Sequence, residues 1–330
     1  MPAVPSGLLP APQWGGLRTQ TPILVVEPEE GRRHALAEEL RLTMGLEVET
    51  RASVPPEGGD WGLVLLDAQA VSPAQTDDVY ERFHAQHVEG KLLILVPSSE
   101  RQDVTRWFER GARHVICRDE PHAAMDAVSA ARKLLLGGAT GPECYLRPGA
   151  RTWSLAVSHS RDKALVFQLC ADLEHELGLG KRKGEALKTI AEEFITNALY
   201  NAPVDHAGSA RFAHLNRRDE VDLPEGEVIR VLVTTDDDRV AISVTDPFGS
   251  LRPTIVPHYL GKCFQAGEDQ VDQKQGGAGL GMYFVYQAVS HLAININPGH
   301  STEMIGFVDR NSTAGAIQRR AHSFGLFVVD

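Results

Sequence analysis

Three things are scarce in this sequence: cysteine, long apolar runs and excess positive charge. Its 330 residues include four cysteines. No two of them have the spacing of a metal site, so we expect reduced thiols in a cytoplasmic protein. No apolar run reaches the roughly 20 residues that a membrane-spanning helix needs, so we expect no membrane partner. The net charge is −11, which argues against nucleic acid as a partner.

The composition divides the chain into a tail and two halves. Residues 1–20 are rich in Pro and Gly and lack the basic start and apolar core of a signal peptide, so they predict a disordered tail. The length of the remainder suits two domains. A segment rich in Gly and Pro lies between Gly137 and Gly149, and we interpret residues 138–154 as a linker.

Residues 21–137 alternate short apolar segments with amphipathic ones. The apolar segments predict strands at 22–26, 61–67, 91–96 and 114–117. The amphipathic segments predict helices at 29–43, 77–86, 100–111 and 121–137. Strands that are apolar throughout and alternate with helices indicate a parallel sheet covered on both faces.

The second half, residues 155–330, follows a different pattern. Two predicted helices, at 163–178 and 189–203, come first. A hairpin follows, with strands at 228–235 and 239–245, and a later hairpin turns at Pro298 and Gly299. A helix at 279–292 and a strand at 324–329 complete this half. Helices grouped beside antiparallel strands predict an α+β sandwich.

Three polar residues recur at steps of four in the helix predicted at 189–203. Glu193, Asn197 and Asn201 form a stripe along the edge of an apolar face. Asn weakens a helix because its amide competes for backbone hydrogen bonds, so a binding role is one interpretation. The amide oxygen of Asn suits Mg²⁺. Alternatively, both Asn side chains form local hydrogen bonds near the helix end at Pro203.

Two glycine motifs follow this helix. Asp246 ends a predicted strand and precedes Gly249 in "DPFG", where an Asp can accept a hydrogen bond from an amine and a Gly admits a flat ring. The same letters also form a common type I turn. The segment "GGAGLG", residues 276–281, leads into a helix, where free backbone N–H groups can bind phosphate. Its alternative is a flexible turn.

Taken in order, the three motifs resemble the N, G1 and G2 boxes of the GHKL, or Bergerat-fold, ATPases. The short leading helix and the Glu four residues before the first Asn look most like the anti-sigma-factor serine kinases. The resemblance covers roughly Leu155 to Asp330. It implies an α+β sandwich of the Bergerat ATPase type, with ATP and Mg²⁺ as cofactors.

The resemblance also implies roles for individual residues. Asn197 would hold Mg²⁺, Glu193 would be the general base, and Asp246 would bind the adenine amine. The other nucleotide-binding residues would be Asn201, Gly249, Gly277, Gly279, Gly281 and Thr302. The sequence departs from the family in having only one glycine in "DPFG". It also offers only Lys262 and Lys274 as candidate phosphate-binding cations before the last box.

The first half resembles a response-regulator receiver domain, which has a flavodoxin-like parallel (βα)5 fold. Asp67 matches the phosphorylated Asp of that family, but its expected partners differ. Pro28 follows Glu27 where a second carboxylate is expected, Val96 stands at the Thr or Ser position, and Arg118 replaces Lys. We therefore predict a pseudo-receiver, which acts as a docking or dimerising module.

Two neighbouring residues are candidate substitutes in that site. Glu29 would have to reach in to supply the second carboxylate, and Ser98 would need a local shift to replace the hydroxyl at the Val96 position.

The two resemblances together predict a cytoplasmic signalling protein of bacterial type. It would bind Mg–ATP and phosphorylate Ser or Thr on a regulatory partner, or sequester that partner; a sigma factor or an anti-sigma antagonist would fit, and the chain could form a homodimer. One alternative is a non-enzymatic, ATP-gated binding module. Another is a histidine kinase using His175, but that residue is too close to Asn197 for a separate dimerisation domain and lacks a following Thr-Pro pair.

Overall fold

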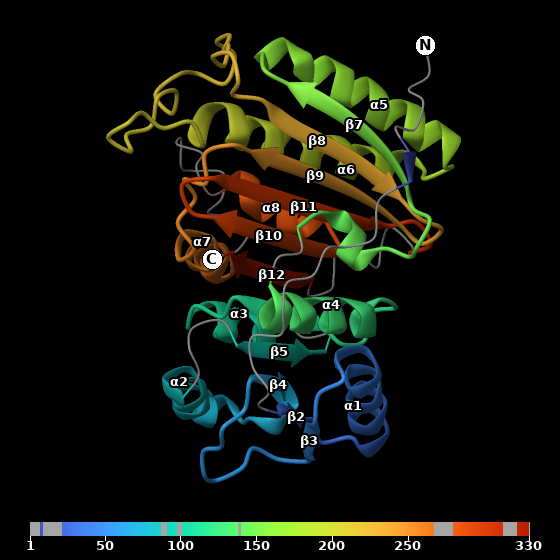
Figure 1. Cartoon of the computed structure of the whole chain (residues 1–330), viewed down its shortest axis with the longest axis vertical. Coiled ribbons are helices and arrows are strands. Elements are labelled where there is room, and N and C mark those ends of the chain that lie inside the picture. The colour runs from blue at the N-terminus through green and yellow to red at the C-terminus, as the bar shows by residue number, and fades with distance from the viewer. Residues whose placement is uncertain are drawn as a thin grey trace.

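In the part of the chain that the structure describes, twelve strands form a single sheet. This sheet runs through both halves of the molecule (Figure 1). The computed structural model describes residues 7–8, 22–86, 91–97, 101–137, 140–266, 280–312 and 322–329. The strand order is β1-β7-β8-β9-β11-β10-β12-β6-β5-β4-β2-β3. Over these ranges, no helix combines the length and the apolarity that crossing a bilayer requires.

The N-terminal half contributes five parallel strands. They are β2 (Ile23–Val26), β3 (Val48–Arg51), β4 (Leu63–Asp67), β5 (Leu92–Val96) and β6 (His114–Cys117). If these five strands are numbered 1 to 5 in chain order, they lie across the sheet in the order 2-1-3-4-5, which is the flavodoxin-like arrangement. The predicted fold of this half is therefore confirmed by its strand order.

Four helices cover this part of the sheet. The side chains of α1 (Glu30–Met44) and α4 (Ala123–Leu136) pack with alternate strand residues such as Val25 and Leu65. The side chains of α2 (Thr76–Gln86) and α3 (Arg101–Phe108) pack with the other set of alternate strand residues, such as Leu66. Because strand side chains alternate between faces, α1 and α4 cover one face and α2 and α3 the other.

The fifth helix of the predicted (βα)5 pattern is absent between β3 and β4, where all residues are described. Residues 52–62 form an irregular loop instead. Two prolines and two glycines in "VPPEGGDW" oppose helix formation there. The ring of Trp61 packs against Phe83 at a centroid distance of 6.3 Å, and its Nε1 donates to Glu49 at 2.7 Å. A single indole therefore fills part of the space that a helix would cover.

The C-terminal half contributes the remaining long strands. Neighbouring antiparallel pairs join β7 (Arg151–Val157), β8 (Ile229–Thr235), β9 (Arg239–Asp246), β11 (Ser301–Asp309) and β10 (His291–Asn297). The last strand, β12 (Ser323–Val328), runs parallel to β10. Both predicted hairpins are present, and the second turns at Pro298 and Gly299 as expected.

Helices α5 (Lys163–Glu176), α6 (Lys181–Thr196) and α8 (Leu280–Ala288) form a layer beside these strands (Figure 1). Their apolar side chains share one core cluster with β8, β9 and β11. A Cβ on Gly306 of β11 would lie 2.9 Å from Ile190 and 3.0 Å from Val289. The glycine thus permits close approach of the helical layer, and helices on an antiparallel sheet give the predicted α+β layering.

Several elements differ from the sequence prediction. The helix expected to reach residue 292 ends at Ala288, and His291 already begins β10. Strand β7 begins within the segment predicted as linker, and β1 (Gly7–Leu8) pairs with it although the tail was predicted to be disordered. Strand β7 is stabilised by pairing with β8, and β1 by pairing with β7. Because these partners are distant in the sequence, the pairing leaves no pattern in the segments themselves.

Helix α7 (Ile255–Ala266) was not predicted, and it contains Pro257 and Gly261, two residue types that disfavour a helix interior. Proline is compatible with the first turn of a helix, where its missing N–H has no partner to lose. A Cβ on Gly261 would lie 3.5 Å from the backbone of Phe108 and Glu109, so α7 packs closely against α3.

The two halves share a packed junction. Strand β6 pairs antiparallel with β12 through Val115 and Phe324, and Phe324 also contacts the ring of Phe108 at a centroid distance of 5.3 Å. Phe108 in turn contacts Tyr286 of α8 at 6.0 Å. Receiver-like and C-terminal residues therefore belong to one continuous apolar cluster.

A buried cluster of charged side chains joins α4 to the C-terminal half. Asp126 accepts two hydrogen bonds from Arg239, at 2.7 and 3.0 Å, and its Oδ2 lies 3.0 Å from Nδ1 of His291. Arg239 also pairs with Asp309 at 3.3 Å, and its side chain is 1% exposed. Burial opposes ionisation of Asp126, but Arg239 and His291 outweigh it and lower the pKa of this carboxyl.

Candidate functional site

A cavity of about 310 Å³ lies between α6, α7, α8 and the ends of β9 and β11. Six of the residues predicted from the sequence line it, and they are Glu193, Asn197, Asn201, Asp246, Gly281 and Thr302. Gly249 lies in the turn after Asp246. Gly277, Gly279 and Lys274 lie outside the described residues, and Lys262 lies in α7. Residues from all three motifs thus meet at one cavity.

The two asparagines lie in a single π-helical turn, η5 (Asn197–Asn201), that continues α6. The backbone N–H of Ala202 donates to the carbonyl of Asn197 at 2.8 Å, which closes the wider turn. The side chain of Asn201 donates to Oδ1 of Asn197, also at 2.8 Å. The local hydrogen bond considered as the alternative therefore exists. It leaves a second lone pair on Oδ1 of Asn197, so that oxygen can still accept a cation.

The groups around Asn197 suit a cation that keeps most of its own ligands. Among the described side chains, no three His, Cys, Asp or Glu residues cluster as a metal site would require. Mg²⁺ typically takes one or two protein oxygens and completes its shell with phosphate and water. The amide oxygen of Asn197 fits that requirement.

Asp246 is fixed by the turn that it opens. Its Oδ1 accepts from the backbone N–H groups of Phe248 at 2.9 Å and Gly249 at 3.2 Å. Thr302 lies directly opposite it in the β9–β11 pairing. Burial raises the pKa of Asp246 to about 6, and the two backbone hydrogen bonds oppose that rise. Both backbone hydrogen bonds use Oδ1, so Oδ2 of Asp246 can accept a further hydrogen bond from a ligand in the cavity.

The glycine of this turn cannot readily be replaced. Gly249 has φ +59°, a left-handed conformation that glycine adopts without strain. A Cβ there would lie 2.2 Å from the backbone oxygen of Asn297 and 2.6 Å from the nitrogen of His300. The turn therefore packs directly against the β10–β11 hairpin, which holds Asp246 at the cavity wall.

Glu193 lies where α6 meets the beginning of α8. A Cβ on Gly281 would fall 1.9 Å from its Oε2, so only glycine allows this approach with the carboxylate in place. The carboxylate is also paired with Arg217, whose Nη1 lies 3.2 Å from Oε1 and 3.5 Å from Oε2. Arg217 comes from the long segment between η5 and β8, and no pattern in the sequence indicated that it would reach this site.

The cavity contains further residues that sequence reasoning missed. Arg252 lines it and is exposed, which places a cation at its mouth. Most of the remaining wall is apolar, as a flat ring requires, and consists of Leu251, Ile255, Val256, Met282 and Met304. Arg252 follows Gly249 by only three residues, and this closeness in the sequence could have indicated that it reaches the same cavity.

Two arginine side chains pair with the carboxylates of the receiver-like site. Asp67 is fully buried at the end of β4, and its Oδ2 lies 2.6 Å from Nη1 of Arg118. Nearby Glu27 is paired with Arg32 at 3.0 Å. Val96 is buried at the end of β5, so no hydroxyl stands at that position.

Neither proposed substitute is shown to complete this site. Glu29 instead caps α1 by accepting from the backbone N–H groups of Gly31 at 2.8 Å and Arg32 at 2.7 Å. Ser98 lies outside the described residues. Two arginines thus stand close to the carboxylates that would otherwise bind a metal ion and a phosphoryl group.

We expect Asp67 to resist phosphorylation. Arg118 already occupies one of its oxygens, and burial raises its pKa to about 7, with Glu27 as the next largest cause. A partly protonated, ion-paired carboxyl is a poor nucleophile. Incubation with acetyl phosphate and Mg²⁺ should leave the intact mass unchanged. A stoichiometric gain of one phosphoryl group that disappears in Asp67→Ala would contradict this expectation.

The same pKa predicts a pH dependence of stability. The folded-state pKa of Asp67, about 7, exceeds the value of about 3.9 for an unfolded Asp. Its contribution is therefore fully present below about pH 4 and is lost as the pH rises to about 7. Relative to Asp67→Asn, the wild type should lose at most about 1.4 kcal/mol of unfolding free energy per pH unit in that window. Urea denaturation at pH 5 and pH 8 measures this, and an unchanged difference would contradict it.

Comparisons with known proteins concern only part of the chain. It matches no protein-family model and no curated protein sequence. A solved structure of the Thermotoga maritima response regulator DrrB, an OmpR/PhoB homolog, is similar at 16% identity and a TM-score of 0.29. That match covers 35% of this chain and 52% of DrrB. A probable two-component response regulator/GGDEF domain protein is similar at 21% identity and a TM-score of 0.28, over 34% of this chain and 47% of that one. The chain thus spans about half the length of these two proteins.

Proposed function

We propose that the C-terminal half binds Mg–ATP and transfers a phosphoryl group to Ser or Thr on a regulatory protein. The observation that carries this proposal is the single cavity that gathers residues of three separate motifs, Glu193 and Asn197 from α6 and η5, Asp246 from β9, and Gly281 from α8. Chance spacing of an asparagine pair, a turn and a glycine segment would not require them to share a cavity.

The arrangement of the cavity suits an adenine nucleotide. Asp246 and Thr302 supply buried polar groups beside an apolar wall, which fits a flat base with an exocyclic amine. At the other side, Asn197 supplies an oxygen for Mg²⁺, and Arg252 supplies a cation for phosphate. The bound cofactors would supply the phosphoryl group and the charge that orients it.

Glu193 is the residue that would take part in the transfer itself. Its carboxylate would accept the proton of a Ser or Thr hydroxyl while that oxygen forms the new bond to phosphorus and ADP departs. Its pairing with Arg217 at 3.2 Å orients the carboxylate. Because Nη1 of Arg217 lies 3.2 Å from Oε1 and 3.5 Å from Oε2, the acceptor hydroxyl must share an oxygen with the arginine or displace it.

That pairing also favours a second candidate function. If Arg217 stays on Glu193, the half would be an ATP-gated binding module, and nucleotide would control capture of the partner without phosphorylating it. For both candidates we propose a cytoplasmic signalling role, a sigma factor or an anti-sigma antagonist as partner, and a possible homodimer.

Substitution of Asp246 tests the nucleotide assignment. Asp246→Asn should weaken ATP binding by about 1–3 kcal/mol, because the amide presents a donor where the amine needs an acceptor. Binding of GTP should not weaken, because guanine carries an acceptor oxygen at that position, which the amide donor suits. Equilibrium dialysis of both nucleotides against wild type and variant measures the difference. Equal ATP affinity in the two proteins would rule out Asp246 as the adenine ligand.

A further inference from the structure

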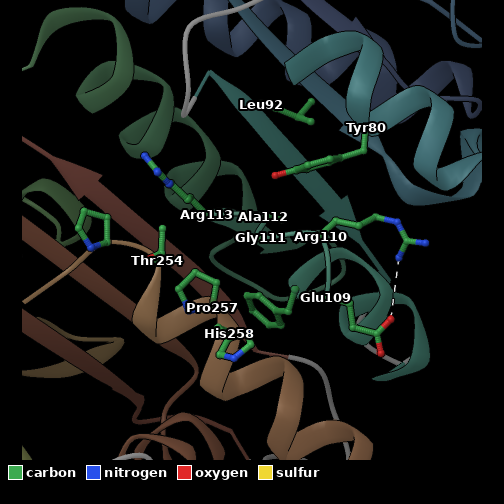
Figure 2. A pocket seen from close by; sticks show the side chains of 12 residues that line it. Tyr80, Leu92, Glu109, Arg110, Gly111, Ala112, Arg113, Thr254, Pro257 and His258 are labelled. Atoms are coloured by element: carbon green, nitrogen blue, oxygen red, sulfur yellow. Dashed lines mark ion pairs between the residues drawn. The ribbon is translucent and has the colours of Figure 1, made fainter. Parts of the chain in front are cut away.

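A second cavity, of about 320 Å³, lies at the junction of the two halves (Figure 2). One wall comes from the receiver-like half, through Tyr80 of α2, Leu92 of β5 and the turn between α3 and β6. The opposite wall comes from the segment that begins α7, through Thr254, Pro257 and neighbouring residues. Cavities of this size between structural units are common ligand sites.

The walls of this junction cavity combine apolar surface with cations. Tyr80, Leu92 and Pro257 provide flat or aliphatic surface, and Figure 2 shows the hydroxyl of Tyr80 directed across the cavity on the side of Arg113. Arg110 is held by Asp77 and lies 3.9 Å from Glu109. Arg113 also lines the cavity, on the side opposite Tyr80 in Figure 2. A guanidinium has five N–H donors, so Arg113 can bind an anionic oxygen beside its contacts within the protein.

We propose that the junction cavity binds a small aromatic anion, with its ring between Tyr80, Leu92 and Pro257 and its phosphate or carboxylate on Arg113. The first turn of α7 follows Thr254 directly, and the positive end of that helix dipole adds to the field of the arginine. Among the described lining residues, Glu109 is the one acidic side chain, and Arg110 is its neighbour.

The first turn of α7 also borders the other cavity. Ile255 and Val256 line the candidate nucleotide cavity, whereas Pro257 and His258 line the junction cavity. A ligand that fixes Pro257 therefore also fixes the residues beside it in the chain. Binding at the junction should reduce amide hydrogen exchange in α7, and this readout does not require the neighbouring site to bind ATP.

Phenyl phosphate is a suitable probe of the junction cavity, with benzyl alcohol as the uncharged match. Calorimetry with the full chain should detect saturable binding of phenyl phosphate that is at least about tenfold tighter than that of benzyl alcohol. Arg113→Gln should weaken phenyl phosphate binding about tenfold. Thr254→Trp, at an exposed position on the rim, should abolish it by filling the cavity.

The control is Arg252→Gln, which alters the other cavity and should leave phenyl phosphate affinity within about twofold of wild type. Far-UV circular dichroism establishes that each variant is folded, and Arg113→Lys, which keeps the charge, should retain most of the binding. Absence of binding by wild type, equal affinity in Thr254→Trp and wild type, or a loss confined to Arg252→Gln would each overturn the proposal.

Discussion

Glu193→Gln should slow phosphoryl transfer by about 10²–10⁴-fold while ATP and the partner still bind. The amide cannot accept the proton of the acceptor hydroxyl, and general-base catalysis contributes a factor of that size. Glutamine has nearly the same shape, so the close approach of Gly281 is kept. Labelled ATP and the co-purified partner protein provide the assay.

Asn197→Ala is the matched comparison, one helical turn away. It removes the proposed metal ligand, so Mg²⁺-dependent ATP binding should be lost together with transfer. If Glu193→Gln transfers phosphate at the wild-type rate, Glu193 is not the base. If the wild type binds ATP tightly but never phosphorylates its partner, the ATP-gated binding module becomes the better description.

Arg239→Met should destabilise the whole chain by about 3–5 kcal/mol. Methionine fills similar space but leaves Asp126 and Asp309 without the buried guanidinium that pairs with both, and an unpaired buried charge carries a penalty of this size. Because Asp126 belongs to α4 and Arg239 to β9, the loss should affect both halves. Urea denaturation followed by circular dichroism measures it.

Arg230→Met is the control for this substitution. Arg230 lies on the neighbouring strand β8 and is exposed, so its replacement should change the free energy of unfolding by less than about 0.5 kcal/mol. A similarly small effect of Arg239→Met would show that the buried cluster does not hold the halves together.

The fold was predictable where the pattern is local. Continuous apolar strands and amphipathic helices identified the flavodoxin-like half, and strand-like segments joined by short turns identified both hairpins. Elements that depend on distant partners were missed, such as β3 and β7, because a strand with mixed polarity is stabilised by its neighbours in the sheet. The pairing of β6 with β12, which fuses the two halves, likewise has no signature near either strand.

The candidate site was predictable to a similar extent. Helical spacing placed Glu193, Asn197 and Asn201 together, and turn chemistry marked Asp246. Arg217 was missed because it lies in an irregular segment whose path no periodicity describes. In the receiver-like half, the mismatch at Arg118 was evident from the sequence, but its direct contact with Asp67 required the three-dimensional arrangement.

Calorimetric titration of ATP into the full-length protein, with and without Mg²⁺, tests the central claim most directly. The cavity formed by Asn197, Asp246 and their neighbours predicts one saturable site per chain, with affinity that falls when Mg²⁺ is removed and that is lost in Asn197→Ala. Absence of ATP binding under both conditions, or binding that Asn197→Ala and Asp246→Asn leave unchanged, would contradict the assignment of this cavity as a nucleotide site.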